Sequence, residues 1–284
     1  MWSDSLKIGV KKIDEQHEML FSKVNELIDD IIKGGDYQKE KIISTVLFLK
    51  EYAVTHFADE EEYQLSIDDP NYPIHKKMHE DFIATVLKHE SNMVASDFAH
   101  KDVSKFTGTL FAWLIYHVSD VDQKIGKVGE DSVVSDGHSD IICECFRHVI
   151  SNVINVNEES ITKIGEHNES FDGSITVKHS FAHVLKGYIV FKYSVSFINE
   201  LIRFLTGIIP EENIIDDFEK TFLLQISTTT VENIYRRLFV DKYELNELEV
   251  FITDKNNDYD QPPTETIALD TKIGIAEVGF TIES

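Results

Sequence analysis

The first half of the chain contains four stretches in which apolar residues return every three or four positions. Such spacing places them along one face of an α-helix. Short polar or Gly/Pro-containing connections separate the four stretches. Four amphipathic helices of this length, joined in this way, predict an antiparallel four-helix bundle. The stripe residues are Ile13, Leu20, Phe21, Val24, Leu27, Ile28, Ile31 and Ile32; Ile42, Val46, Leu49, Ala53 and Phe57; Met78, Phe82 and Val86; and Val103, Phe106, Leu110, Trp113, Leu114 and Val118.

The second half follows a different pattern, which predicts a second domain. A polar, glycine-containing segment, GKVGEDSVVSDGHSD, interrupts the helical periodicity near residue 130. Helices at about 141–154 and 214–238 are expected, together with a helix in SVSFINELIRFLTG. The alternating stretches SITVKHS and GYIVFKYS predict a hairpin. With LEVFITD, ETIALD and KIGIAEVGFTIE they predict an α/β domain with a largely antiparallel sheet. The predicted organisation is a helical domain at 1–128, a linker at 129–137 and an α/β domain at 138–284.

The charge balance restricts the class of partner. The 284 residues carry a formal net charge of −24 at pH 7. This excess of acids argues against nucleic acid or an anionic membrane as the main partner. The sequence shows neither a signal-peptide pattern nor an apolar run of about eighteen residues. The two cysteines, in the sequence CEC, are expected to be reduced thiols. These features predict a cytoplasmic protein.

Seven imidazole and carboxylate side chains interrupt the apolar stripes and are expected to point into the bundle. One histidine in such a stripe is usually a hydrogen-bonded core residue. Burying seven such groups without a compensating ion would cost several kcal/mol for each unpaired group. Nitrogen and oxygen ligands without thiolate suit iron or manganese, and two six-coordinate ions with shared carboxylates would use all seven. The sequence therefore predicts a dinuclear iron centre. Its candidate ligands are His17, His56, Glu60, His75, His79, His117 and Asp122.

Two local features of these motifs lead to further expectations. Asp122 comes five residues after His117, which turns it about 140° around an ideal α-helix. We therefore expect the helix to end or bulge between them. The acids Asp59, Glu61 and Glu62 lie off the inward line of their helix, and a solvated face is the preferred interpretation.

The first 125 residues or so resemble a bacterial hemerythrin domain. The words IGVKKIDEQHEML, HFADEE, HKKMHEDF and WLIYHVSDVD carry the resemblance, with a single histidine on the first helix and then HxxxE, HxxxH and HxxxxD. It implies one iron at His75, His79 and His117, a second at His17 and His56, and bridges from Glu60, Asp122 and an oxo or hydroxo group. It also implies dioxygen as the ligand of an open iron position.

Residues 138–284 resemble the CheC/CheX family of chemotaxis phosphatases. The resemblance lies in the layout of GYIVFKYSVSFINELIRFLTG, TFLLQISTTTVENIY and PPTETIALDTKIGIAEVGFTIE. Active members carry a glutamate and, three residues later, an asparagine on the long helix. Gln225 and Thr228 occupy these positions here. Loss of the carboxylate and displacement of the amide argue against strong phosphatase activity.

Together these resemblances predict a di-iron sensor of dioxygen or redox state that regulates a CheX-like signalling domain. The implied partners are dioxygen, a phosphorylated CheY-like receiver and a second copy of the chain, which would dimerise through the C-terminal domain. Two alternatives remain: an oxygen carrier or scavenger whose C-terminal domain only dimerises, and an oxygen-regulated phosphatase.

Overall fold

The computed structural model divides the chain into two compact units. Unit 1 comprises residues 1–131 with 216–218, and unit 2 comprises 132–215 with 219–284. Among the described residues, no helix is both long and apolar enough to cross a membrane. The predicted linker at 129–137 lies outside the described residues, apart from Gly137. The residues that the structure describes are 2–32, 39–127, 137–154, 156–164, 174–182, 186–207, 217–239, 249–253 and 263–283.

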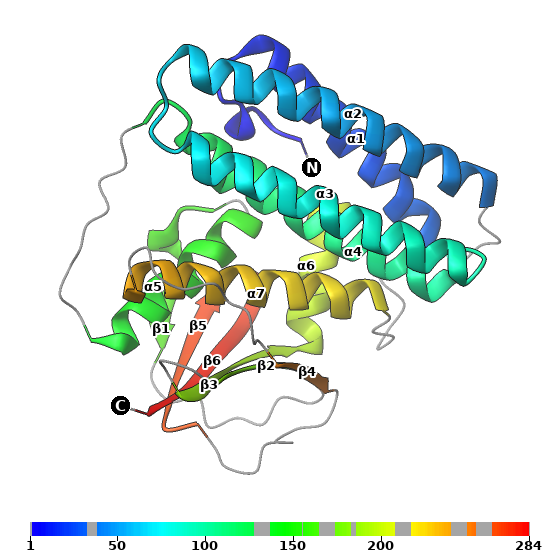
Figure 1. Cartoon of the computed structure of the whole chain (residues 1–284). Coiled ribbons are helices and arrows are strands. Elements are labelled where there is room, and N and C mark those ends of the chain that lie inside the picture. The colour runs from blue at the N-terminus through cyan, green and yellow to red at the C-terminus, as the bar shows by residue number, and fades with distance from the viewer. Residues whose placement is uncertain are drawn as a thin grey trace. The chain divides into compact units, whose positions relative to one another are not determined.

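Unit 1 is the predicted four-helix bundle (Figure 1). Helix α1 packs against α2 and α4, and α3 packs against the same two helices. The connection between α2 and α3 is tight, and Asp69 closes it by accepting a hydrogen bond from the Asn71 amide at 2.9 Å. Pro73 then lies in the first turn of α3, where its missing N–H leaves no helical hydrogen bond unmade. The four helices are α1 (Lys11–Ile32), α2 (Lys39–Ser66), α3 (Tyr72–Ala95) and α4 (His100–Tyr116).

The predicted apolar stripes form the core of this bundle. Nearly all of their members whose burial is described are buried. Four members, Ala53, Met78, Val86 and Trp113, are only half-buried. Three of these, Ala53, Val86 and Trp113, line a cavity in the bundle, which accounts for their residual exposure.

One end of the bundle is closed by irregular structure. Helix α4 continues as a π-helical turn, His117–Val121, and then as a 3₁₀ turn, Asp122–Lys124. Gln123 Nε2 donates to the Leu6 carbonyl at 2.9 Å, which ties the N-terminal segment to this end. Asp14 accepts from the backbone amides of residues 8 and 9 at 2.8 and 3.2 Å. Backbone groups that the helices leave open are therefore satisfied by neighbouring side chains.

Unit 2 contains an antiparallel sheet of six strands in the order β1-β5-β6-β3-β2-β4. The predicted hairpin is β2 and β3, in register from the pair Ser174–Ser194 to the pair Ala182–Lys186. The strand β1 was not predicted from the sequence. Every described pairing is antiparallel, which confirms the predicted sheet type. The strands are β1 (Thr162–Ile164), β2 (Ser174–Ala182), β3 (Lys186–Ser194), β4 (Glu249–Thr253), β5 (Glu265–Thr271) and β6 (Gly274–Glu283).

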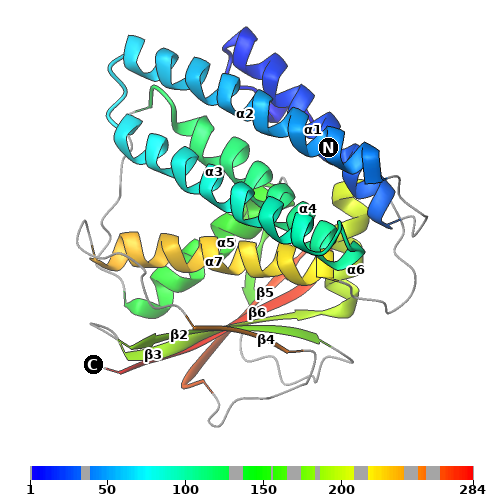
Figure 2. The same cartoon turned by 45° about the vertical axis from the view of Figure 1, so that its right-hand side comes forward.

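Three helices of unit 2, α5 (His138–Val153), α6 (Val195–Thr206) and α7 (Asp217–Phe239), lie over one face of this sheet (Figure 2). Ser194 caps α6 by accepting from the Phe197 amide at 3.1 Å. Gly207 ends it in the left-handed conformation at φ 72°. Both cysteines lie on α5, buried and unpaired as expected.

Residues 227–230 of α7, with the sequence STTT, form side-chain hydrogen bonds within their own helix. Ser227, Thr228 and Thr230 each donate a side-chain hydroxyl to the carbonyl four residues earlier, at 2.8 to 3.0 Å. Tyr193 on β3 lies with its hydroxyl 3.1 Å from that of Ser227. These bonds satisfy hydroxyls that would otherwise be buried without partners.

Candidate metal centre

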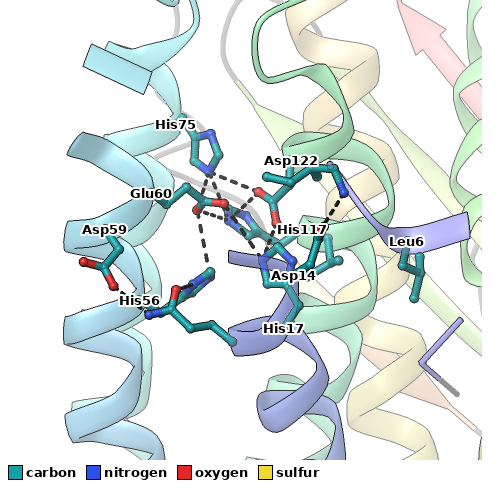
Figure 3. A network of polar contacts seen from close by, with 12 residues as sticks. Leu6, Asp14, His17, His56, Asp59, Glu60, His75, His117 and Asp122 are labelled. Atoms are coloured by element: carbon teal, nitrogen blue, oxygen red, sulfur yellow. Dashed lines mark hydrogen bonds and ion pairs between the residues drawn. The ribbon is translucent and has the colours of Figure 1, made fainter. Parts of the chain in front are cut away.

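The structure brings all seven predicted ligands together inside the closed end of the bundle, and Figure 3 labels six of them, all except His79. Helix α1 contributes one of them, and two each come from α2, from α3 and from the irregular turns that follow α4. On α2 and α3 the pairs are four residues apart, so that both side chains of a pair lie on the inward face. Each of the seven is at most 2% exposed: His17, His56, Glu60, His75, His79, His117 and Asp122.

The π-helical turn explains the five-residue spacing of the last pair. His117 begins the turn and Asp122 comes directly after it. A π-helix hydrogen-bonds to the fifth residue, so it widens by about one residue per turn and returns Asp122 to the side of His117. The expectation that the helix ends or bulges here is confirmed: the last regular α-helical residue is Tyr116.

The seven side chains form two groups that share Glu60. One group is Glu60 with His75, His79 and His117; the other is Glu60 with His17 and His56. Within each group the potential ligand atoms lie within 4.8 Å of one another.

Asp122 also contacts both groups. Its Oδ2 lies 3.2 Å from Nε2 of His17, and its Oδ1 lies 3.2 and 3.1 Å from Nε2 of His75 and His117. Two carboxylates thus lie between two sets of imidazoles, an arrangement that suits two ions with shared ligands.

The polar atoms of this cluster are unsatisfied by the protein alone. Both oxygens of Glu60, both oxygens of Asp122 and both ring nitrogens of His17 are buried without a hydrogen bond of good geometry. Such groups are costly unless an ion or another partner compensates them. The residues present therefore fit bound metal, because coordination would satisfy oxygens and nitrogens that nothing else in the described structure satisfies.

The protonation states of four of the seven side chains favour coordination. Burial lowers the pKa of His56 to about 3 and that of His117 to about 4. Burial also lowers the pKa of His75, but the nearby carboxylates of Asp122 and Glu60 have the larger opposite effect and raise that pKa to about 10. Burial is likewise outweighed at both carboxylates, where the neighbouring imidazoles hold the pKa values of Glu60 and Asp122 well below their usual range. At neutral pH the carboxylates are ionised and His56 and His117 are neutral, as metal ligation requires, whereas His75 carries a proton that a bound metal ion would displace.

A second layer of polar groups orients the imidazoles. Gln16 places Oε1 3.2 Å from His56 Nδ1 and donates from Nε2 to Asp59 at 2.7 Å. On the other side of the centre, Gln64 Nε2 lies 2.8 Å from His75 Nδ1 and donates to Asp69 Oδ2 at 3.3 Å. With Nδ1 occupied in this way, Nε2 of each ring faces the centre.

The interpretation of the acids on α2 as a solvated face is wrong for two of the three. The side chains of Asp59 and Glu61 are only 16% and 18% exposed. Asp59 holds Gln16, and Glu61 Oε1 lies 3.3 Å from Nδ1 of His79. Only Glu62 is exposed. The sequence also did not predict that Gln64 and Asp69 support His75.

Comparison with known proteins agrees with this geometry. The family model described as "Hemerythrin HHE cation binding domain" matches residues 8–128. A bacteriohemerythrin of Pseudomonas paraeruginosa is 30% identical over 125 residues, which cover 43% of this chain and 76% of that relative. Through its first half, the chain belongs to the hemerythrin family. The bacteriohemerythrin of Clostridium acetobutylicum is 29% identical over 44% of this chain and 96% of its own length.

Solved structures with a likeness to part of the chain include two chemotaxis proteins. One is CheX from a complex with CheY, BeF₃ and Mg²⁺ from Borrelia burgdorferi, with a TM-score of 0.40, 14% identity and coverage of 52% of this chain and 99% of that chain. The other is CheX from Vibrio vulnificus, with a TM-score of 0.40, 9% identity and coverage of 51% and 99%.

In the hemerythrin domain, Gln64→Leu should weaken metal binding although all seven candidate ligands are retained. The leucine fills the same space but leaves His75 Nδ1 unsupported, and loss of such an outer partner typically costs about 10–100-fold in metal affinity. Iron retention against a competing chelator measures the effect. Gln225→Leu, on α7, is the control and should retain iron like the unaltered protein. Equal retention by the Gln64 variant would show that the amide does not support the centre.

Proposed function

We propose that the hemerythrin domain holds two iron ions and binds dioxygen reversibly. The observation that supports this most strongly is that Glu60 and Asp122 each contact imidazoles of both histidine groups, at 3.1 to 3.9 Å. A single ion would need only one group. Two bound irons supply the redox equivalents and the coordination position that reversible dioxygen binding requires.

The side chains have distinct roles in this proposal. His75, His79 and His117 would hold one iron, and His17 and His56 the other, with Glu60 and Asp122 as bridges. Three aromatic rings keep water away from one side of the centre: Phe57 stacks on His79 at 3.8 Å, Trp113 stacks on His117 at 4.1 Å, and Phe82 stacks on Trp113 at 3.7 Å between centroids. A dry surround strengthens electrostatic interactions at the centre.

The experiment is anaerobic reduction and then stepwise addition of dioxygen, monitored by visible absorption with iron measured on the same sample. We expect about two irons per chain, since two histidine groups share the carboxylates, and an absorption band that appears with dioxygen and disappears when dioxygen is removed. Immediate oxidation without a reversible band would support a redox sensor instead. A protein that takes up no iron, or only one zinc ion, would contradict the proposal.

We further propose that unit 2 is a signalling output regulated by the state of the iron centre. The support is that the domain has its own core and that its sequence layout resembles CheX. If dioxygen bound to unit 1 changes the affinity of unit 2 for its partner by some factor, thermodynamic linkage fixes the reverse effect. The bound partner must then change the dioxygen affinity of unit 1 by the same factor. Measuring dioxygen affinity with and without a phosphorylated CheY-like receiver tests this. No change in affinity would favour an oxygen carrier whose second domain only dimerises.

Unit 2 should have little phosphatase activity of its own. Gln225 and Thr228 are both half-buried on α7. Thr228 donates its hydroxyl to the carbonyl of Leu224 at 2.9 Å, so it is committed to its own helix and not to a substrate water. We expect a phosphorylated receiver to lose phosphate no faster with the protein than without it. A gain of activity in the double variant Gln225→Glu, Thr228→Asn would indicate a degenerate active site, whereas rapid hydrolysis by the unaltered chain would contradict the expectation.

A further inference from the structure

An apolar cavity of about 210 Å³ lies inside the bundle next to the candidate metal centre. All four helices contribute to it. On α1 and α3 the lining residues come after the ligands His17 and His79 in sequence. On α2 and α4 they come before the ligands His56 and His117, with the exception of Phe57. The inner wall includes Phe57 and Trp113, whose rings stack on His79 and His117, and Phe82, whose ring stacks on Trp113.

The lining offers water almost no hydrogen-bond partners. Fourteen of the fifteen lining residues are apolar, and the remaining one is Lys50. A buried water needs two to four polar partners, and cavities lined by Leu, Ile and Phe stay dry but take up benzene or xenon at about 150 Å³. The present cavity is larger than that engineered example and offers a ring or a short hydrocarbon a surface of matching polarity.

The mouth of the cavity lies between α2 and α3. Val54 and Leu87 line the cavity and are nevertheless 59% and 47% exposed, so this side is open to solvent. Lys50 contacts both carboxylate oxygens of Glu90, at 2.9 and 2.7 Å. Since the two charges neutralise each other, the mouth provides no free charge for an ionic head group, and the chemistry favours a neutral ligand.

We propose that this cavity is a binding site for a neutral apolar molecule, the size of a benzene ring or slightly larger, that enters between α2 and α3. The occupant would lie against Phe57 and Trp113 and so touch the rings that pack on two of the candidate ligands. The proposal does not depend on which ion the centre holds, because the lining residues are apolar side chains of the protein itself.

Iodobenzene is the probe, since it fits the size and its iodine both quenches indole fluorescence and scatters X-rays anomalously. The chain has two tryptophans. In a Trp2→Phe background of the full chain, Trp113 is the only one and reports directly on the cavity. We expect saturable quenching, and anomalous density for iodine within the cavity of crystals grown with the probe.

Two variants fill the cavity from different helices: Ala53→Leu from α2 and Val86→Phe from α3. Each should weaken iodobenzene binding at least tenfold, whereas Ala84→Leu, an exposed position on α3, should leave it within twofold. Circular dichroism and matched metal content establish that each variant is folded. Quenching that never saturates, equal binding by the filled variants, or iodine density only outside the cavity would overturn the proposal. The density in the unaltered cavity decides the matter even if a filled variant does not fold.

Discussion

Glu60→Gln should abolish retention of both ions of the proposed di-iron centre. The amide keeps the shape of the side chain but removes a charge that faces both histidine groups. We expect metal affinity to fall by at least about 100-fold, because this residue would itself coordinate, whereas loss of a supporting partner alone costs about 10–100-fold. Metal content after anaerobic reconstitution with iron and subsequent desalting measures the loss.

Comparison with a single-group variant makes this test specific. His56 belongs to only one of the two groups, so His56→Gln should leave about one ion per chain instead of two. Glu62→Gln, the same chemical change at an exposed position of α2, is the matched control and should retain both. If Glu60→Gln retained as much iron as the control, the carboxylate would not be a shared ligand.

His179→Leu should stabilise unit 2, and increasingly so as the pH falls. His179 is fully buried on β2, opposite Ile189, with neither ring nitrogen hydrogen-bonded. Burial lowers its pKa to about 4, compared with 6.5 in the unfolded chain. The neutral form is therefore the folded form, and between pH 6.5 and 4 the unfolded chain binds a proton that the folded chain does not.

The size of this effect is set by the pKa difference. A shift of one pKa unit corresponds to 1.36 kcal/mol, so His179 lowers the free energy of unfolding by up to about 3 kcal/mol between pH 6.5 and 4. Removal of two unsatisfied buried nitrogens adds about 1–3 kcal/mol at any pH. Urea unfolding at pH 7 and pH 4.5, monitored by hydrogen exchange of peptides from β2 and β3, measures both contributions. His138→Leu, at an exposed position, should show neither. A gain in stability that is independent of pH would show that His179 does not titrate in this range.

The candidate ligands could be predicted from the sequence because each interrupts a helical apolar stripe. Imidazoles and carboxylates at such positions must point inward, and the interval between His117 and Asp122 even signalled the irregular turn. The orienting residues carried no comparable signal. Gln16 and Gln64 are ordinary helix residues, and Asp69 lies in a connection whose sequence indicates only a turn. Their roles depend on contacts between helices, which periodicity along one helix does not describe.

Unit 2 was predicted less completely, for a related reason. The hairpin β2–β3 is local and is indicated by alternation, so its type was predictable. The three-residue strand β1 is too short for a periodic signal, and the order of the strands depends on pairings between segments that are distant in sequence. His179 continues the inward-facing alternation of Ile175 and Val177, but only the structure shows that it is buried without a partner.

The irregular turn after α4 makes the centre sensitive to chain length as well as to composition. Each residue added to or removed from an ordinary helix rotates the rest of that helix by about 100°. Removal of one residue from Val118–Val121 would allow a regular α-helix there, with good hydrogen bonds. The carboxylate of Asp122 would then lie four residues after His117, one turn along a narrower helix, and the backbone beyond it would be drawn back toward α4. Related chains should therefore hardly vary in the number of these four residues, and their identity should vary most at the half-buried positions Ser119 and Val121, since Val118 and Asp120 are buried.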